Sequence, residues 1–360
     1  MKCCIDCFKD SEIREIIHKY GTRGNCDFCS AKNVDVYDIS EFPNMISDKI
    51  ISLIQIYSPS QRSDARYLKE VLRDDWDIFS GGTEGIKTLL TALCPFESEL
   101  DIDKDILVKK VAVEKLHDTD YINDYGVARG LSWAEFSESI KHTNRFFSSN
   151  FNSDVFSSFL TMVQKTYEKG TNFYRARISP NPEGFVTKEM FAPPIGKRTA
   201  GRVNPDGIGV LYLSTDDKTV LNETRVTAYD YVTIGTFKNK RPLRVANISE
   251  ISRVSPFLYN DEFERFALNR KVFQEMAYEI AKPIRRNDSP LEYLPTQYIA
   301  EFVKSEGFDG VEYESTLNPG GTNLALFNES LVECINVKTI EITNVQYKFC
   351  LLYTSPSPRD

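Results

Sequence analysis

Five of the eight cysteines in this 360-residue chain lie within its first 29 residues, and four of these form two closely spaced pairs. Cys4 and Cys7 are separated by two residues, as are Cys26 and Cys29, and eighteen residues lie between the pairs. Two Cys-x-x-Cys turns can complete a tetrahedral Cys4 shell around Zn²⁺. Four thiolates leave the ion no open coordination position, so we predict a structural zinc site and not a catalytic one.

Some alternatives remain open at these cysteines. Cys3 is adjacent to Cys4 and could replace it as a ligand, and His18 is a weaker alternative ligand. Unpaired reduced thiols or a redox-active dithiol are two further interpretations. Between the pairs, Asp10 as an N-cap and the apolar residues that follow it at helical spacing predict a short helix. We therefore expect residues 1–35 to form a zinc-ribbon-like, Cys4 zinc-binding module.

A second group of chemistry-bearing side chains lies beyond residue 170, near the ends of expected strands. They are Arg175, Arg202, Asn204, Tyr212, Ser214, Glu223, Ser315 and Asn323. Arg can bind phosphate, Tyr can stack on a ring, and Ser or Asn can bond ribose or phosphate oxygens. A carboxylate can stabilise an oxocarbenium-like centre. The set suits a phosphorylated ligand with an aromatic ring, and the alternative interpretation is a buried ion pair between Arg175 and Glu223.

Several segments of this part of the chain together resemble the RES domain, a family named for its Arg, Glu and Ser. They are residues 173–177, the loop GRVNPDGIG, the strand LYLS, then TVLNETR, GFDGVEYEST and NLALF, in the family's order over roughly residues 170–340. The resemblance implies a fold similar to that of ADP-ribosyltransferases. It also implies catalytic roles for Arg175, Tyr212, Glu223 and Ser315. Arg202, Asn204, Ser214 and Asn323 are expected to bind the substrate.

The same resemblance implies an activity. RES enzymes act on NAD⁺ and cleave its nicotinamide–ribose bond, so we expect an NAD⁺ glycohydrolase or phosphorylase. Many are toxins paired with an antitoxin, so an antitoxin or another regulatory protein is an expected partner. Some carry a Cys-rich helical extension, which residues 1–165 resemble. The alternatives are an ADP-ribosyltransferase that modifies a macromolecule, and a non-catalytic zinc-ribbon interaction protein that binds a nucleotide.

The elements that must position these side chains differ along the chain. Residues 36–168 have apolar residues at helical spacing and predict a helical interaction or regulatory domain, with a less clear third segment at residues 106–113. Residues 169–345 predict an α+β catalytic domain with a mostly antiparallel core. Its expected strands are 171–178, 207–214, 231–237, 243–248, 311–313 and 323–327, and its expected helices are 219–227, 261–280 and 295–305.

Composition narrows the function classes further. The formal net charge of −8 argues against broad nucleic-acid binding, which needs a positive surface. No apolar run approaches the roughly 20 residues of a membrane-spanning helix, and the N-terminus lacks the apolar stretch of a secretory signal. We therefore expect a cytoplasmic protein. The final residues, 346–360, contain two Ser-Pro steps and are predicted to be a disordered, non-native tail.

Overall fold

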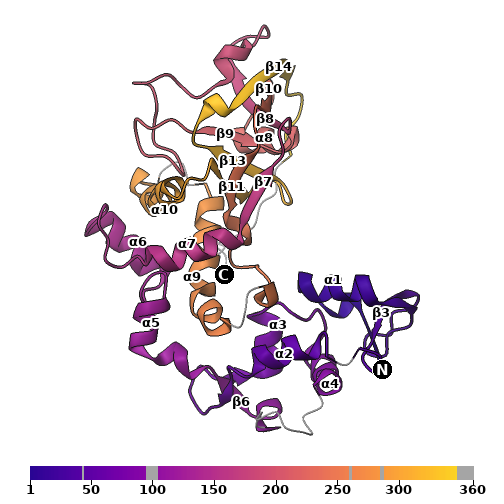
Figure 1. The fold of residues 1–360 in the computed structure, drawn as a ribbon. Coiled ribbons are helices and arrows are strands. Elements are labelled where there is room, and N and C mark those ends of the chain that lie inside the picture. Colours follow the sequence, from indigo (N-terminus) through magenta and orange to yellow (C-terminus); the bar gives the residue numbers. More distant parts are fainter. Residues whose placement is uncertain (43, 95–103, 259–261, 284–287, 347–360) are drawn as a thin grey trace, which may run out of the picture. The chain divides into compact units, whose positions relative to one another are not determined.

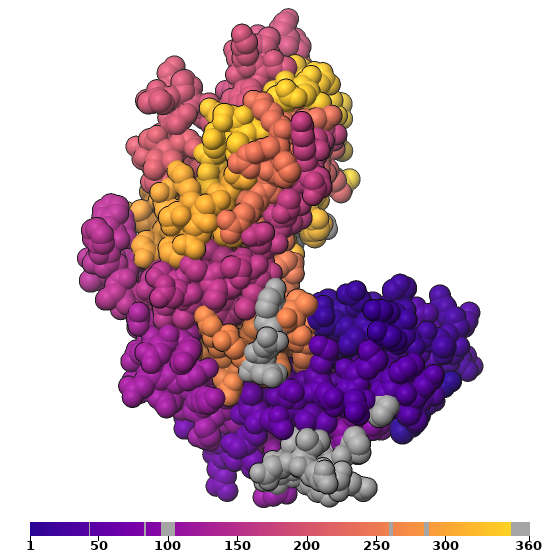
Figure 2. Space-filling model, in the orientation of Figure 1, coloured from indigo at the N-terminus to yellow at the C-terminus, as the bar shows by residue number. Residues whose placement is uncertain are grey.

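The protein forms two compact units. The first consists of Met1–Val163 and Glu250–Ala277, and the second of Gln164–Ser249 and the residues from Tyr278 onward. The computed structural model describes residues 1–42, 44–94, 104–258, 262–283 and 288–346, which are the coloured parts of Figures 1 and 2. Among these residues, no helix combines the length and the apolar character that crossing a bilayer requires.

The cysteine-rich start of the first unit folds around one short helix. α1 (Ser11–Tyr20) begins after Asp10, whose carboxylate accepts a hydrogen bond from the Ile13 N–H at 3.0 Å, so the predicted N-cap is confirmed. Ile13 and Ile17 are buried on one face of this helix. Three short antiparallel strands accompany it in the order β1 (Lys2–Cys4), β3 (Val34–Asp38) and β2 (Thr22–Gly24).

Helices make up most of the remainder of the first unit. They are α2 (Ser47–Ile54), α3 (Leu68–Asp74), α4 (Thr83–Leu93), α5 (Thr119–Tyr125), α6 (Trp133–His142), α7 (Ser153–Met162) and most of α9 (Phe263–Ala281), with the 3₁₀ turns η1 (Ile5–Cys7), η2 (Lys104–Leu107), η3 (Glu114–His117) and η6 (Pro256–Leu258). Aromatic side chains join them: Phe159 of α7 lies edge-on to Phe273 of α9, with ring centroids 4.7 Å apart. The helices α2 to α7 lie within residues 36–168, where helices were predicted, and the interaction or regulatory role of this segment stays a prediction.

One predicted segment of this unit is different. The apolar residues at 106–113 form no α-helix: η2 is followed by the strand β6 (Lys110–Ala112), which pairs between β4 (Ser58–Pro59) and β5 (Arg66–Tyr67). Val111 and Val113 are two residues apart, a spacing that fits extended backbone better than a helix. The prediction of a helical segment there is wrong.

An eight-stranded sheet forms the centre of the second unit (Figure 1). Its strand order is β14-β10-β8-β9-β13-β12-β11-β7, and all neighbouring strands are antiparallel except β11 and β12. The strands are β7 (Gln164–Tyr167), β8 (Asn172–Ser179), β9 (Leu211–Ser214), β10 (Tyr231–Asn239), β11 (Leu243–Asn247), β12 (Gly310–Glu314), β13 (Thr322–Leu326) and β14 (Val332–Glu341). The helical elements are α8 (Asp217–Thr224), α10 (Leu294–Ser305), η4 (Thr187–Met190), η5 (Ile248–Glu250), η7 (Pro290–Tyr293) and η8 (Glu329–Leu331). The prediction of an α+β domain with a mostly antiparallel core is confirmed.

The core of this sheet is aliphatic and aromatic. Phe173 of β8 lies opposite Phe237 of β10 in the register, and both side chains are fully buried. The other buried members of the cluster are Met190, Leu211, Leu213, Leu243, Val245, Leu324, Leu326 and Val332. At about 1.5–3 kcal/mol for each fully buried side chain of this type, the cluster holds the central strands firmly in register.

The two compact units differ in two ways from the contiguous domains predicted at 36–168 and 169–345. Residues Glu250–Ala277 group with the first unit, and β7 lies before residue 169 yet belongs to the sheet. β7 is held there by Lys165, whose Nζ lies 2.8 Å from Oε1 of the buried Glu312. The long strand β14 was not expected, because its sequence does not alternate clearly between apolar and polar residues. Its Ile335 is exposed at the edge of the sheet. The predicted tail at 346–360 lies, apart from its first residue, outside the described residues.

Candidate functional site

A cavity of about 320 Å³ lies in the second unit, where the middle strands of the sheet meet α8 and the loop before β9. Its lining residues come from segments far apart in the chain. They are Arg175, Ala176, Gly201, Arg202, Tyr212, Leu213, Ser214, Val220, Glu223, Thr224, Tyr293, Tyr313 and Asn323. Six of the eight site residues predicted from the sequence therefore line one cavity. The other two, Asn204 and Ser315, hydrogen-bond to lining residues.

Glu223 is the carboxylate of this cavity. It lies near the end of α8, whose first turn is capped by the Asp216 carboxylate. Its Oε1 accepts hydrogen bonds from Ser315 Oγ at 2.7 Å and from Asn323 Nδ2 at 2.8 Å. Its Oε2 lies 3.8 Å from the Arg202 guanidinium. One carboxylate oxygen is thus fixed by two donors, and within the described part of the chain the other is held only by a loose ion pair.

The two donors to Glu223 are themselves oriented. Ser315 Oγ accepts hydrogen bonds from the backbone N–H groups of Leu317 and Asn318, at 3.2 and 3.1 Å, so its proton is directed to Glu223. Asn323 accepts a hydrogen bond from Ser214 Oγ at 2.6 Å, which leaves its NH₂ group to face the carboxylate. Ser214 and Asn323 are direct partners in the β9–β13 register. The sheet register therefore determines how Glu223 is held.

Arg202 is buried, with only 8% of its surface exposed, and three groups surround its guanidinium. One nitrogen donates to the Ala281 carbonyl at 2.8 Å, and another approaches Glu223. The guanidinium carbon also lies 5.1 Å from the centroid of the Tyr313 ring, within cation–π range. The loop itself is held by Thr296 of α10, whose hydroxyl donates to the Arg202 carbonyl at 2.6 Å.

Tyr212 and Asn204 form one hydrogen-bonded unit beside the cavity. The Tyr212 hydroxyl donates to Asn204 Oδ1 at 2.7 Å and accepts from the Val203 N–H at 3.2 Å. The Asn204 NH₂ group donates to backbone carbonyls of the same loop, including that of Ile208 at 2.9 Å. Gly201 is needed here, because a Cβ would lie 2.5 Å from Asn204 Oδ1 and 2.6 Å from the Tyr212 hydroxyl. Burial raises the pKa of Tyr212 above its usual range.

Arg175 of β8 supplies the cavity's second guanidinium. One of its nitrogens donates to the Tyr212 carbonyl at 3.2 Å, and its buried Nε has no hydrogen-bond partner among the described residues. Burial lowers the pKa of Arg175 to about 10, and the nearby Arg177 adds to this effect. The alternative of an Arg175–Glu223 ion pair is not found in the described structure, where the cation beside Glu223 is Arg202. Arg175 is therefore a desolvated cation at the cavity wall, an arrangement that favours an anionic ligand.

Sequence reasoning missed two tyrosines of the lining, Tyr293 and Tyr313. Tyr313 lies on β12, two residues before Ser315, so the strand alternation could have placed it on the cavity side. Burial raises its pKa to about 12. Tyr293 ends the short turn η7, and no local pattern indicated it.

The sulfurs of Cys4, Cys7, Cys26 and Cys29 lie within 4.8 Å of one another in the first unit. The distances between neighbouring sulfurs are 3.3 Å for Cys4 and Cys29, 3.6 Å for Cys7 and Cys26, and 3.7 Å for Cys4 and Cys7. Tetrahedral thiolates around zinc, with Zn–S bonds of about 2.3 Å, are separated by about 3.8 Å. These residues could hold a metal ion.

The two alternative ligands are placed elsewhere. The Cys3 sulfur lies 3.9 Å from the Tyr37 carbonyl, and Cys3 is not part of the four-sulfur group. His18 is exposed and lies 3.6 Å from the Asp35 carboxylate. Among the described cysteines no disulfide is formed. The geometry therefore favours Cys4 over Cys3 as the first member of the cluster.

Comparison with known proteins places this cavity within a family. Residues 172–348 match the family model described as the RES domain, a range that contains every lining residue of the cavity. No curated protein sequence matches the chain significantly. A similar solved structure is titled "Crystal structure of the M.tuberculosis MbcT-MbcA toxin-antitoxin complex"; it is 12% identical, covers 51% of this chain and 91% of that chain, and has a TM-score of 0.32. A TM-score this low does not establish a shared fold.

Proposed function

Because residues 172–348 belong to the RES domain family, we propose that the Arg175–Glu223 cavity binds NAD⁺ and that the enzyme cleaves its nicotinamide–ribose bond. The observation that carries the proposal is the shared cavity. Arg175 and Glu223 are 48 positions apart in sequence (223 − 175), yet both line the same hollow of about 320 Å³. That volume is at the lower end for a ligand site, which suits the nicotinamide riboside end of the molecule.

Substrate binding uses the cations and rings of the lining. Arg175 has an unsatisfied buried Nε and contacts a phosphate of the substrate. The Arg202 Nε also has no partner among the described residues, but the two terminal nitrogens of Arg202 are engaged by Ala281 and Glu223, so Arg202 acts first on Glu223 and only secondarily on the substrate. Tyr212 and Tyr313 offer ring faces to the nicotinamide or its ribose. Asn204 keeps Tyr212 in place through its hydroxyl and is a positioning residue.

The bond that breaks joins C1′ of the ribose to the nicotinamide nitrogen. Its electron pair leaves with nicotinamide, and the positive charge that develops at C1′ is stabilised by the Glu223 carboxylate. Oε2 of Glu223 is the oxygen suited to this role, because Ser315 and Asn323 bind Oε1. Water then attacks C1′ and gives ADP-ribose and a proton. Ser315 donates a hydrogen bond to Glu223 and is not among the residues that line the cavity, so it is a positioning residue for the reaction.

The acceptor distinguishes the remaining possibilities. Water makes the enzyme a glycohydrolase, inorganic phosphate makes it a phosphorylase that yields ADP-ribose 1″-phosphate, and a side chain of a macromolecule makes it an ADP-ribosyltransferase. If nothing attacks C1′ and NAD⁺ stays intact, the domain is a nucleotide-binding module. All four use the same cavity, and product analysis separates them.

Zinc is the proposed occupant of the Cys4 cluster. Four sulfurs without a disulfide, at separations close to those of a tetrahedral thiolate shell, fit zinc better than a redox dithiol. When bound, the ion supplies cross-linking of two turns and no chemistry on a substrate. Cys7 and Cys26 bring the two turns together from either side of α1.

Family membership also supports control by a partner protein, an antitoxin or another regulator. A toxin of this kind lowers cellular NAD⁺ when its partner is absent. We expect expression of the chain alone to slow growth and deplete NAD⁺, and expression of its Glu223→Gln variant to do neither.

The decisive experiment is incubation of the purified chain with NAD⁺, with and without phosphate, followed by chromatography of the products. We expect nicotinamide to be released in equal amount to ADP-ribose or its 1″-phosphate. Glu223→Gln should lower turnover on the order of 10²–10³, as loss of an electrostatic stabiliser does elsewhere. Glu306→Gln, a carboxylate at the end of α10 outside the cavity, is the matched control and should be unaffected. NAD⁺ consumption by Glu223→Gln at a rate close to that of the wild-type chain would refute the assignment.

A further inference from the structure

A second cavity lies in the first unit and, at about 530 Å³, is larger than the one in the RES domain. Its walls come from β5, α3, β6, η3 and the part of α9 that belongs to this unit. Ligand sites for small molecules typically occupy roughly 300–1,000 Å³, so this cavity has the size of a mononucleotide site.

One wall of this second cavity is apolar and rigid. Trp76 is buried, and its indole N–H donates to the Tyr57 hydroxyl at 2.7 Å, which fixes the ring. Val111 and Val113 of the β6 region add aliphatic surface. A fixed indole beside branched aliphatic side chains is a suitable surface for a flat ring.

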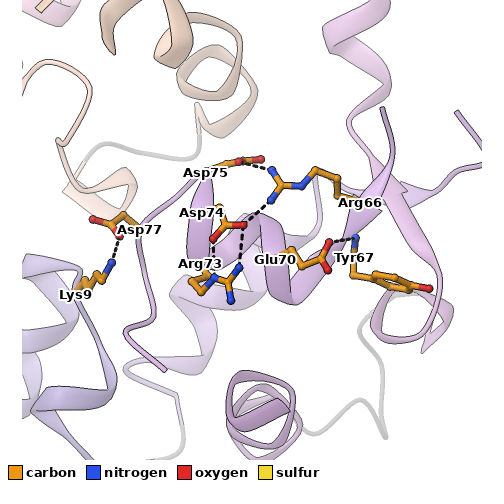
Figure 3. A network of polar contacts seen from close by, with 8 residues as sticks. All are labelled: Lys9, Arg66, Tyr67, Glu70, Arg73, Asp74, Asp75 and Asp77. Carbon is orange, nitrogen blue, oxygen red and sulfur yellow. Dashed lines mark hydrogen bonds and ion pairs between the residues drawn. The ribbon is translucent and has the colours of Figure 1, made fainter. Parts of the chain in front are cut away.

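The carboxylates of the lining are already paired with cations, as Figure 3 shows for those near α3. Arg66 binds both Asp75 at 2.7 Å and Asp74 at 2.6 Å, and Arg73 also binds Asp74. The third lining carboxylate, Asp64, lies 3.4 Å from Arg62 and 3.3 Å from His117. These acidic groups are compensated and do not make the cavity negative.

The neighbouring carboxylate Asp77 is occupied in the same way. It forms an ion pair with Lys9 at 2.7 Å, the contact at the other end of Figure 3. Asp75 and Asp77 attract Arg270 through space, but in the described structure their ion pairs are with Arg66 and Lys9.

Arg270 differs from the paired charged groups of the lining. Its Nε is buried without a hydrogen-bond partner in the described part of the chain, and its guanidinium carbon lies 6.0 Å from the Trp76 ring centroid. Burial lowers the pKa of Arg270, as it does for Arg175 in the Arg175–Glu223 cavity of the RES domain, called the RES cavity below. Lys271 and Gln274 follow on the same helix, and both line the cavity from exposed positions. A half-buried cation with an unsatisfied donor, next to a second cation, favours an anion.

We propose that this cavity binds a mononucleotide-sized molecule whose phosphate or carboxylate contacts Arg270 and Lys271 and whose flat ring lies against Trp76. The proposal rests on the cavity, the paired carboxylates and the unsatisfied guanidinium of the first unit. It is independent of the function proposed for the RES domain.

Tryptophan fluorescence can test this proposal directly. The chain has two tryptophans, so Trp133→Phe in the full-length protein leaves Trp76 as the only one. The probes are AMP, adenosine 5′-carboxylate, adenosine and ribose 5-phosphate. We expect at least one of the two anionic nucleosides to quench Trp76 saturably, at least tenfold more tightly than adenosine or ribose 5-phosphate. Comparison of the affinities for AMP and adenosine 5′-carboxylate then shows which anion the site prefers.

Variants locate the binding and separate it from the RES cavity. Arg270→Gln should weaken binding at least tenfold, which is about 1.4 kcal/mol. Lys110→Gln, an exposed cation on β6 that does not line the cavity, is the matched control and should bind normally. Arg175→Gln should also leave the quench unchanged, because Arg175 lines the other cavity. If Arg270→Gln unfolds, Arg270→Lys must restore folding and retain part of the affinity.

Three results would overturn the proposal. They are quenching that does not saturate with either anionic probe, an affinity for adenosine equal to that for both anionic nucleosides, and equal binding by Arg270→Gln and the wild-type chain. Loss of the quench in Arg175→Gln would instead place the bound nucleotide in the RES cavity, and would equally refute a site at Trp76.

Discussion

The cysteine cluster and the RES cavity bring side chains together in different ways. Each half of the cluster comes from one tight turn, and its thiolates would repel one another without a cation between them. In the cavity, Glu223 is bound by Ser315 and Asn323, which lie about a hundred positions away in the chain and are placed by the sheet. The groups that hold Glu223 are therefore hydrogen-bonded to one another before any ligand arrives, whereas the Arg175 Nε has no partner among the described residues.

Because of this difference, we expect the two regions to lose their structure or activity in different ways. A site that depends on one ion is expected to lose its structure as a whole when that ion is removed. A site that depends on many hydrogen bonds is expected to weaken step by step, by an amount set by each bond that is lost. The following variants test whether the two regions behave in these two ways.

Removal of the metal should give the largest effect. Binding of a structural zinc ion is worth on the order of 10–16 kcal/mol, more than so small a module can gain from its own core. With Cys26→Ser, or with a strong chelator, we expect the amide protons of α1 to lose their protection from hydrogen exchange. The amides of β8 and β10 should keep theirs, because they belong to the other unit. Hydrogen exchange with mass spectrometry measures both.

The control for this prediction is Cys3→Ser. The Cys3 sulfur lies near the Tyr37 carbonyl and outside the four-sulfur group, so this variant should retain one zinc ion per chain by native mass spectrometry. Zinc loss in Cys3→Ser would show that the ligand set is wrong. Full protection of α1 in a zinc-free chain would show that the module does not depend on the ion.

Loss of the anion-binding group in the RES cavity should have an intermediate effect. A hydrogen bond to a charged group is worth about 1.5–3 kcal/mol, so Arg175→Gln should raise the KM for NAD⁺ on the order of tenfold to a hundredfold. The kcat should change much less, because Arg175 binds the substrate away from the bond that breaks. Steady-state kinetics of nicotinamide release separates the two constants.

Arg177→Gln is the matched control for Arg175. It lies two residues further along β8, and its guanidinium stacks on the Phe185 ring at 4.2 Å and binds the Glu189 carbonyl. It does not line the cavity, so its KM should stay within about twofold of the wild-type value. An equal rise of KM in both variants would indicate a general effect of charge and not a contact with the substrate.

How much of this could be predicted from the sequence depends on the range of the interactions. The cysteine pairs and the α1 cap act over a few residues, so their types and spacing were sufficient to predict them. The strands around the cavity were predicted by alternation, but the register that joins Ser214 to Asn323 is not contained in any local pattern. The role of Asn204 was not foreseen for the same reason. Its hydrogen bonds to the loop and to Tyr212 exist only once the loop has folded.

The smallest effect is expected at Ser315, which contacts Glu223 and not the cavity. Ser315→Ala removes one of the two hydrogen bonds on Oε1, and Asn323 retains the other. A hydrogen bond to a carboxylate contributes about 1.5–3 kcal/mol, but because Asn323 still holds Oε1 we expect only part of this to be lost, and kcat to fall about two- to tenfold. In the Glu223→Gln background the same substitution should lower kcat by a smaller factor, because the carboxylate that Ser315 orients is absent. Ser305→Ala, which removes a hydroxyl that donates to the Phe302 carbonyl on α10, should leave kcat unchanged. If Ser315→Ala alone costs as much as Glu223→Gln, the hydroxyl acts on the substrate itself, and the stepwise weakening expected of this cavity is wrong.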